Sequence, residues 1–181
     1  MSPLPAVVTH NYHPHRGAFR NICDLSDADA ERVLDEIRAA GTARLRPSYL
    51  RKRRATEAWL TAERTRKLGD TPLHRPIYFF LGDFADGQDP ARLRSFLLPL
   101  EVFAPETLTF TYPDSMASFS LARGTDRKPH HGRVFTLDEI ETFVADQGMP
   151  DPRGPARHDR FIEVQVWDKA PLVPPLPSGD F

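Results

Sequence analysis

The chain has 181 residues, 40% hydrophobic and 27% charged, with a net charge of −1. This length suits one domain with a real core, and a net charge so close to zero indicates neither a nucleic-acid nor a membrane partner. A single cysteine, Cys23, excludes an intrachain disulfide framework, and without a signal-peptide pattern or an apolar run near 18 residues we expect a cytoplasmic protein outside the membrane.

The first strand is predicted at residues 6–10 (AVVTH), and a cluster of histidines begins at its end. His13 and His15 are two residues apart, so an extended backbone, which the intervening proline favours, places both imidazoles on one face. With His10 and Arg16, these side chains could hold the ribose or pyrophosphate of a nucleotide through charge-assisted hydrogen bonds.

The same histidines could instead bind a metal ion, if a third ligand came from elsewhere in the chain. The candidate third ligands are His130, His131, His158 or an acidic residue. No spacing matches a known metal motif, and we therefore expect no metal.

Two helices are predicted between residues 26 and 69. The first begins at Ser26, a capping residue, and stops near Gly41. The second fits between Ser48 and Gly69. Its apolar face is thin and is expected to consist of Leu50, Ala55, Ala58, Trp59 and Ala62.

The second helix belongs to the most basic part of the chain. Residues 44–67 hold nine of the 24 lysines and arginines. One reading is a solvated helix face; the other is a surface that binds nucleic acid or a phosphate-bearing cofactor. The four cations that crowd a single turn are Arg51, Lys52, Arg53 and Arg54.

Four further extended segments are predicted before the last helix. Residues 76–82 (PIYFFLG) are typical of a buried strand, and 95–103 and 107–112 of two more. Residues 116–121 are predicted as a short strand or extended segment. The last helix is indicated by a capping box between Thr136 and Glu139, and it ends at a glycine.

The last strand lies within residues 159–172 (DRFIEVQVWDKAPL). Its alternation puts Ile162, Val164 and Val166 on one side, which we expect to be core. Glu163 and Gln165 lie on the other side, between Phe161 and Trp167, where they suit the wall of a cleft. Glu163 could stabilise a developing oxocarbenium ion or act as a general base; the alternative is an ordinary solvent-facing glutamate.

The order of elements predicts an α+β fold. Two helices precede most of the strands and a third precedes the last, which does not fit a regular βαβ alternation. We therefore expect a single domain over residues 1–172, with a mixed or mainly antiparallel sheet and about three helices. Residues 173–181 are a proline-rich tail.

The order and texture of these features resemble the ADP-ribosyltransferase superfamily, most of all its DNA-targeting toxin branch. The resemblance lies in VVTHNYHPHRGAF before a helix, in the strand PIYFFLG, in FTYPDSMAS and in RFIEVQVWDKAPL. It implies that NAD is the substrate and that Glu163 is the catalytic carboxylate. It also implies a nucleotide site formed by His10, His13, His15, Arg16, Tyr78 and Gln165.

The leading hypothesis is thus a small enzyme that binds NAD and transfers ADP-ribose, with nucleic acid as one acceptor class. A non-catalytic module that binds nucleic acid through the basic helix is the first alternative. A histidine-metal enzyme is the second. The sequence indicates neither the acceptor nor the oligomeric state.

Overall fold

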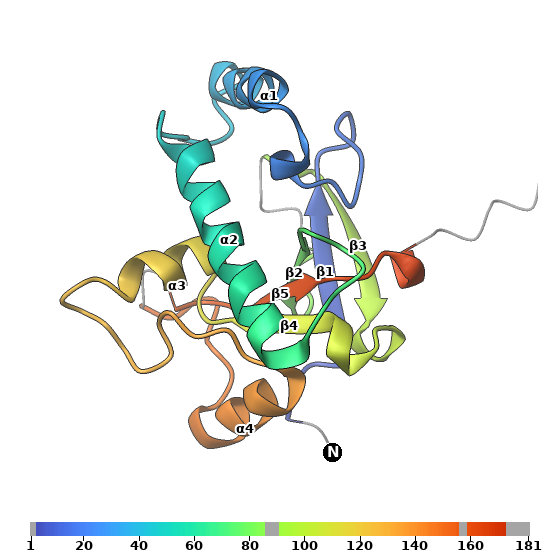
Figure 1. Cartoon of the computed structure of the whole chain (residues 1–181), viewed down its shortest axis with the longest axis vertical. Helices are drawn as coiled ribbons and strands as arrows, with labels where there is room; N and C mark the ends of the chain where they lie inside the picture. The colour runs from blue at the N-terminus through green and yellow to red at the C-terminus, as the bar shows by residue number, and fades with distance from the viewer. Residues whose placement is uncertain (1–2, 86–90, 156–158, 173–181) are drawn as a thin grey trace, which may run out of the picture.

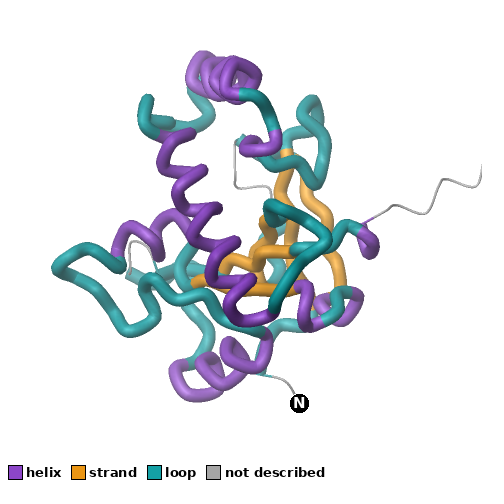
Figure 2. The backbone as a smooth tube through the Cα atoms, viewed as in Figure 1, coloured by secondary structure: helices purple, strands orange, loops and turns teal. Residues whose placement is uncertain are grey.

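A five-stranded sheet forms the centre of the computed structural model, which describes residues 3–85, 91–155 and 159–172. Every neighbouring pair of these described strands is antiparallel, in the order β3-β1-β2-β5-β4 (Figures 1 and 2). The strands are β1 (Val7–Tyr12), β2 (Ile77–Leu81), β3 (Arg94–Pro99), β4 (Leu108–Thr111) and β5 (Glu163–Val166).

The described part of the chain has four α-helices: α1 (Asp27–Ala39), α2 (Tyr49–Leu68), α3 (Ser115–Leu121) and α4 (Leu137–Gln147). The α+β prediction is confirmed. The long helix α2 crosses one face of the sheet, and α4 packs against the other (Figure 1). Short 3-10 turns complete the order at Ile22–Asp24, Leu100–Val102, Pro105–Thr107 and Ala170–Leu172.

One predicted element was wrong. Residues 116–121, predicted as extended, form the helix α3, and the Asp114 side chain caps it by accepting a hydrogen bond from the Ala117 N–H at 3.0 Å. Asp114 follows a proline, and no helix start was predicted there. A helix of seven residues has too few turns for its periodicity to be recognised in the sequence.

The two faces of the sheet differ in chemistry, as the alternation in the last strand predicted. Val164 and Val166 of β5 face a large apolar core, which they share with Ile140 and Val144 of α4. Residues paired directly across antiparallel strands share a face, so Glu163 lies on the opposite face beside Phe80 and Thr111. Gln165 lies beside Tyr78 and Thr109 on that same polar face.

The face of α2 that packs on the sheet is partly polar, contrary to the predicted apolar stripe. The alanines predicted to face inward, Ala55, Ala58 and Ala62, are exposed. The buried positions include Leu50, Glu57, Leu60 and Arg64, which follow one another at spacings of seven, three and four residues. The helix thus carries charged groups against the polar face of the sheet.

The structure does not describe the predicted tail at residues 173–181, nor His158. Within the described ranges, none of the helices has the length and apolar character required for a membrane span.

Candidate active site

A cavity of about 260 Å³ opens on the polar face of the sheet. Its walls come from segments far apart in the sequence, because the end of β1, the middle of β2, the start of β5 and the first turns of α2 meet there. The charged and polar residues that line it are Asn11, Arg53, Tyr78, Arg92, Asp114 and Glu163. Tyr49, Phe80, Met116 and Phe161 supply aromatic and apolar walls.

Glu163 is only 7% exposed, although it lines the cavity. Its Oε1 accepts hydrogen bonds from the Ser115 N–H at 3.2 Å and from Gln165 Nε2 at 3.1 Å. Burial raises the pKa of Glu163 above its ordinary value, while Arg53 and these two hydrogen bonds oppose the rise. The carboxylate is therefore held in a fixed orientation in a weakly solvated site.

A chain of buried hydrogen bonds orients Glu163 from the side away from the cavity. The Trp167 Nε1–H donates to Thr109 Oγ1 at 2.8 Å, and the Thr109 hydroxyl donates to Gln165 Oε1 at 3.0 Å. The Gln165 amide then donates to Thr111 Oγ1 and to Glu163 Oε1. These partners fix which way the amide points, so Gln165 supports the carboxylate from within the core and is not among the residues that line the cavity.

Arg53 is held on the α2 side of the cavity. Its guanidinium lies 3.8 Å from the centre of the Tyr78 ring, and its Nε lies 3.4 Å from Glu57 Oε1. The Tyr78 hydroxyl donates to the same Glu57 oxygen at 3.0 Å. Burial alone would lower the pKa of Arg53, but nearby Tyr78 and Glu163 outweigh it and the pKa is raised. Arg53 is thus a permanent cation beside the Glu163 carboxylate.

His10, predicted to contact a nucleotide, uses both ring nitrogens inside the fold. Nδ1 lies 2.8 Å from the Tyr78 carbonyl oxygen, which can only accept, so this nitrogen carries the proton. Nε2 accepts a hydrogen bond from the Phe19 N–H at 2.9 Å. Burial lowers the pKa of His10 to about 4, so the ring is neutral at pH 7. This arrangement makes His10 an anchor for the loop that contains Phe19.

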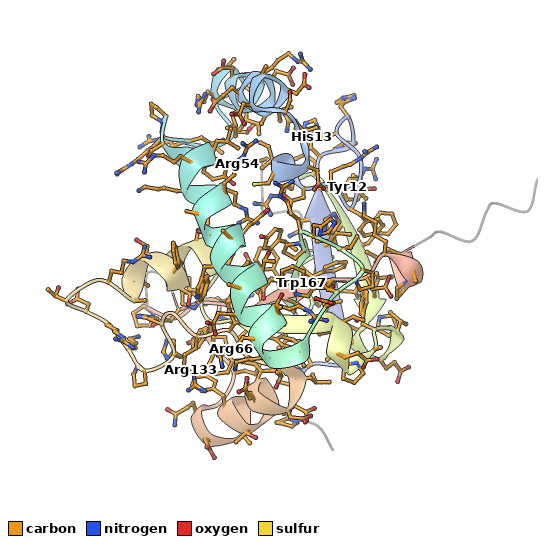
Figure 3. The ribbon with its side chains drawn as sticks, in the orientation of Figure 1. Tyr12, His13, Arg54, Arg66, Arg133 and Trp167 are labelled. Carbon is orange, nitrogen blue, oxygen red and sulfur yellow. The ribbon has the colours of Figure 1, made fainter. Side chains whose placement is uncertain are left out.

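The other members of the predicted nucleotide cluster lie beyond the end of β1. His13 and His15 are close together, with ring centres 5.4 Å apart, and the His15 N–H donates to His13 Nδ1 at 3.3 Å. Figure 3 labels His13 near the loop that follows β1, close to Tyr12. Neither these histidines nor Arg16 line the cavity. Of the predicted cofactor residues, Tyr78 alone lines it with Glu163.

The four adjacent cations of α2 point in different directions. Arg51 and Lys52 are exposed, whereas Arg53 turns into the cavity. Arg54 forms an ion pair with Asp27 and donates to the Leu25 carbonyl oxygen at 3.3 Å (Figure 3). A shared phosphate-binding face can therefore include Arg51 and Lys52, while Arg53 faces the cavity and Arg54 is held in a surface ion pair with α1.

A second polar cluster, of His130, His131 and Asp159, has ligand atoms within 4.8 Å of one another. His131 Nδ1 accepts from the Lys128 N–H at 3.1 Å, so its proton is on Nε2, which lies 3.1 Å from Asp159 Oδ1. Asp159 also forms an ion pair with the Lys128 side chain. With these bonds His131 has no lone pair free for a metal, and the cluster ties the loop around Lys128 to the segment before β5.

The sequence pattern placed Glu163 on the wall of a cleft, and Glu163 does line the cavity. It did not place Arg53, Asn11 or Asp114 there. Arg53 was assigned to the outer basic surface because it stands in a run of four cations. A signal was present in the spacing of Leu50, Arg53, Glu57 and Leu60, which follows a helical stripe if charged residues are allowed in it.

Comparisons with protein-family models, with curated proteins and with solved structures gave no significant match for this chain. The resemblance to ADP-ribosyltransferases therefore remains a prediction from the sequence.

Proposed function

We propose that the protein is an enzyme that binds NAD and transfers ADP-ribose, with Glu163 as its catalytic carboxylate. The observation that supports this most is the buried Glu163 carboxylate, oriented by Ser115 and Gln165 and exposed to a cavity that also holds the Arg53 guanidinium. Perturbed titratable groups gathered in one cavity are typical of catalytic sites.

In the proposed reaction the bond between nicotinamide and ribose breaks, and positive charge develops on the ribose. A fixed carboxylate in a site of low dielectric stabilises that charge more than water would, because it does not have to reorient. Glu163 satisfies this requirement, since one of its oxygens already accepts two hydrogen bonds.

The other cavity residues suit the rest of a dinucleotide. Arg53 offers a planar cation to the pyrophosphate, and its contact with Tyr78 keeps the guanidinium in place. The rings of Tyr49 and Phe161 offer flat surfaces to a base or to nicotinamide.

The test compares wild type with Glu163→Gln for the release of nicotinamide from NAD. The amide keeps the size of the side chain but removes its charge, so we expect a rate loss on the order of 10²–10³. The melting temperature should change little. Glu36→Gln, an exposed glutamate of α1, is the matched control and should keep full activity. Wild-type protein that neither binds nor consumes NAD would contradict the proposal.

We propose nucleic acid as the acceptor class because Arg51 and Lys52 are exposed on the same turns of α2 that carry Tyr49 and Arg53 into the cavity. Replacing Arg51 and Lys52 together by alanine should weaken oligonucleotide binding and reduce the slope of log affinity against log salt by about 2. Arg66→Ala, at the far end of the same helix, is the control.

Two results would distinguish the proposed enzyme from the alternative hypotheses. Salt-dependent oligonucleotide binding without any NAD turnover would identify a non-catalytic binding module. Equal oligonucleotide binding by the double variant and wild type would show that Arg51 and Lys52 form a solvated face.

A further inference from the structure

The exposed apolar side chains of the described chain are concentrated at one edge of the sheet. Six large hydrophobic side chains are exposed in the described part of the chain, and four of them lie between residues 93 and 102. They are Leu93, Phe96, Leu97 and Val102, with exposed fractions of 57, 40, 44 and 43%. Phe96 and Leu97 are neighbours in β3, so they expose apolar surface on both faces of the same strand.

β3 is an edge strand, and its outer side has hydrogen-bonding groups without a described partner strand (Figure 1). The opposite edge is different: Phe110 of β4 exchanges backbone hydrogen bonds of 2.9 and 2.8 Å with Phe135. Monomeric proteins protect edge strands with charges, bulges or covering segments, since an open apolar edge pairs with other strands.

The register shows which amides of β3 point outward. The Leu100 N–H donates to the Ala6 carbonyl oxygen, and β1 and β3 pair without interruption from Val7↔Pro99 to Tyr12↔Arg94. Because amide direction alternates along a strand, Leu98, Phe96 and Arg94 direct their N–H groups to β1. The N–H groups of Ser95 and Leu97 therefore point away from the sheet, whereas Pro99, which has none, occupies the next outward position.

We propose that β3 pairs antiparallel with β3 of a second copy of this chain, around a two-fold axis at Phe96. Ser95 of each copy then pairs with Leu97 of the other, and these two pairs form four backbone hydrogen bonds. Phe96 meets its own copy in the non-hydrogen-bonded pair at the axis, where opposed side chains are closest. Leu93 meets Pro99 of the second copy.

The charges along this edge favour a second copy as the partner. β3 begins with the exposed cation Arg94, and the exposed anion Glu101 follows its other end. Antiparallel pairing places the basic end of each strand at the acidic end of the other and keeps the two Arg94 side chains apart. A closed two-fold contact of this kind uses the same patch on both molecules.

The experiment measures the mass of wild type, Leu97→Pro and Leu97→Lys by sedimentation over a concentration series. Leu97→Pro removes an outward amide, which edge strands tolerate, and replaces the exposed leucine side chain by the smaller proline ring. By symmetry it deletes two hydrogen bonds, so we expect dimerisation to weaken about 30-fold. Leu97→Lys leaves the backbone intact and also favours the monomer, because charge on an edge opposes pairing. Met149→Lys, an exposed apolar residue outside β3, is the matched control and should dimerise like wild type.

Hydrogen exchange supplies a second readout on the wild type. The amides of Ser95 and Leu97 should become protected as the concentration rises, while Leu98 is protected throughout. A wild type that stays monomeric at every concentration would overturn the proposal. So would a dimer that both Leu97 variants leave unchanged, since its interface would lie elsewhere.

Discussion

Single polar side chains decide what the buried polar face of this sheet can do. Glu57, Glu163 and Gln165 are almost completely inaccessible, and removing such groups from water is costly unless each finds a partner. The Gln165 amide has hydrogen-bond partners for both its oxygen and its nitrogen. Glu57 accepts hydrogen bonds from Tyr78 and Asn21 and forms an ion pair with Arg53. The fold therefore maintains a costly polar arrangement next to a cavity, which is the pattern expected of a functional site.

The burial of His10 predicts how the stability of the protein depends on pH. Its pKa is about 4 in the folded protein against 6.5 in an unfolded chain, because burial disfavours the charged ring. Between these values the unfolded chain binds a proton that the folded protein does not, so stability falls as the pH drops from 6.5 towards 4. At pH 5 the contribution of this one group is about 2 kcal/mol.

Urea unfolding of wild type and His10→Gln at pH 7.5 and pH 5 measures this contribution. The variant should lose less stability than wild type between the two pH values. His74→Gln, which changes an exposed histidine, should keep the wild-type difference. Identical pH dependence in wild type and His10→Gln would show that His10 is not the titrating group.

At the scale of elements, local signals predicted most of the fold. The caps at Ser26 and Thr136 marked the starts of α1 and α4, and the alternation in β5 separated its apolar face from its polar face. Two kinds of information were missing. The helix α3 is too short for periodicity. The inward face of α2 carries charges with partners far away in the sequence, such as Tyr78 for Glu57 and the Glu106 carbonyl oxygen for Arg64, and no local pattern reveals them.

The helix α4 is predicted to be structural only. The Thr136 hydroxyl accepts from the Glu139 N–H, and the Glu139 side chain accepts from the Thr136 N–H at 2.8 Å. Thr136→Ala breaks the first of these bonds, so it should lower the free energy of unfolding by about 1 kcal/mol and leave ligand binding unchanged. Thr142→Ala, on the exposed side of α4, is the control and should cost less. A selective loss of NAD binding at unchanged stability would contradict the structural assignment.

On the scale of the whole molecule, one face of the sheet carries the main apolar core and the other carries the cavity. The face under α4 holds the main apolar core, and most of the hydrophobic stabilisation comes from there. The face under α2 has a smaller apolar cluster of Leu60, Val134 and Trp167, next to the buried polar network of Gln165 and Glu163. The cavity lies on this second face, where α2 meets the sheet through Arg53 and Glu57.

Arg53 therefore connects the helical layer to the sheet by its charge, and Arg53→Met tests this connection. The methionine keeps an apolar stem, but it leaves Glu163 without the cation that favours its charged form and leaves Glu57 with Arg75, 3.5 Å away, as its remaining described ion-pair partner. We therefore expect a stability loss of about 3 kcal/mol at neutral pH. Arg53 opposes the rise in the pKa of Glu163, and that pKa should rise further without it.

The sign of the pH effect follows from linkage. A carboxyl group whose pKa is higher in the folded than in the unfolded state costs stability once the pH exceeds the unfolded value, because ionisation is then easier in the unfolded chain. The deficit of Arg53→Met relative to wild type should consequently be larger at pH 8 than at pH 5, and His10 cancels because both proteins contain it. Urea unfolding at the two pH values measures the deficit, with Arg66→Met on the exposed side of α2 as the control. An equal deficit at both pH values would mean that Arg53 contributes packing alone, and that Glu163 keeps its charge without help from α2.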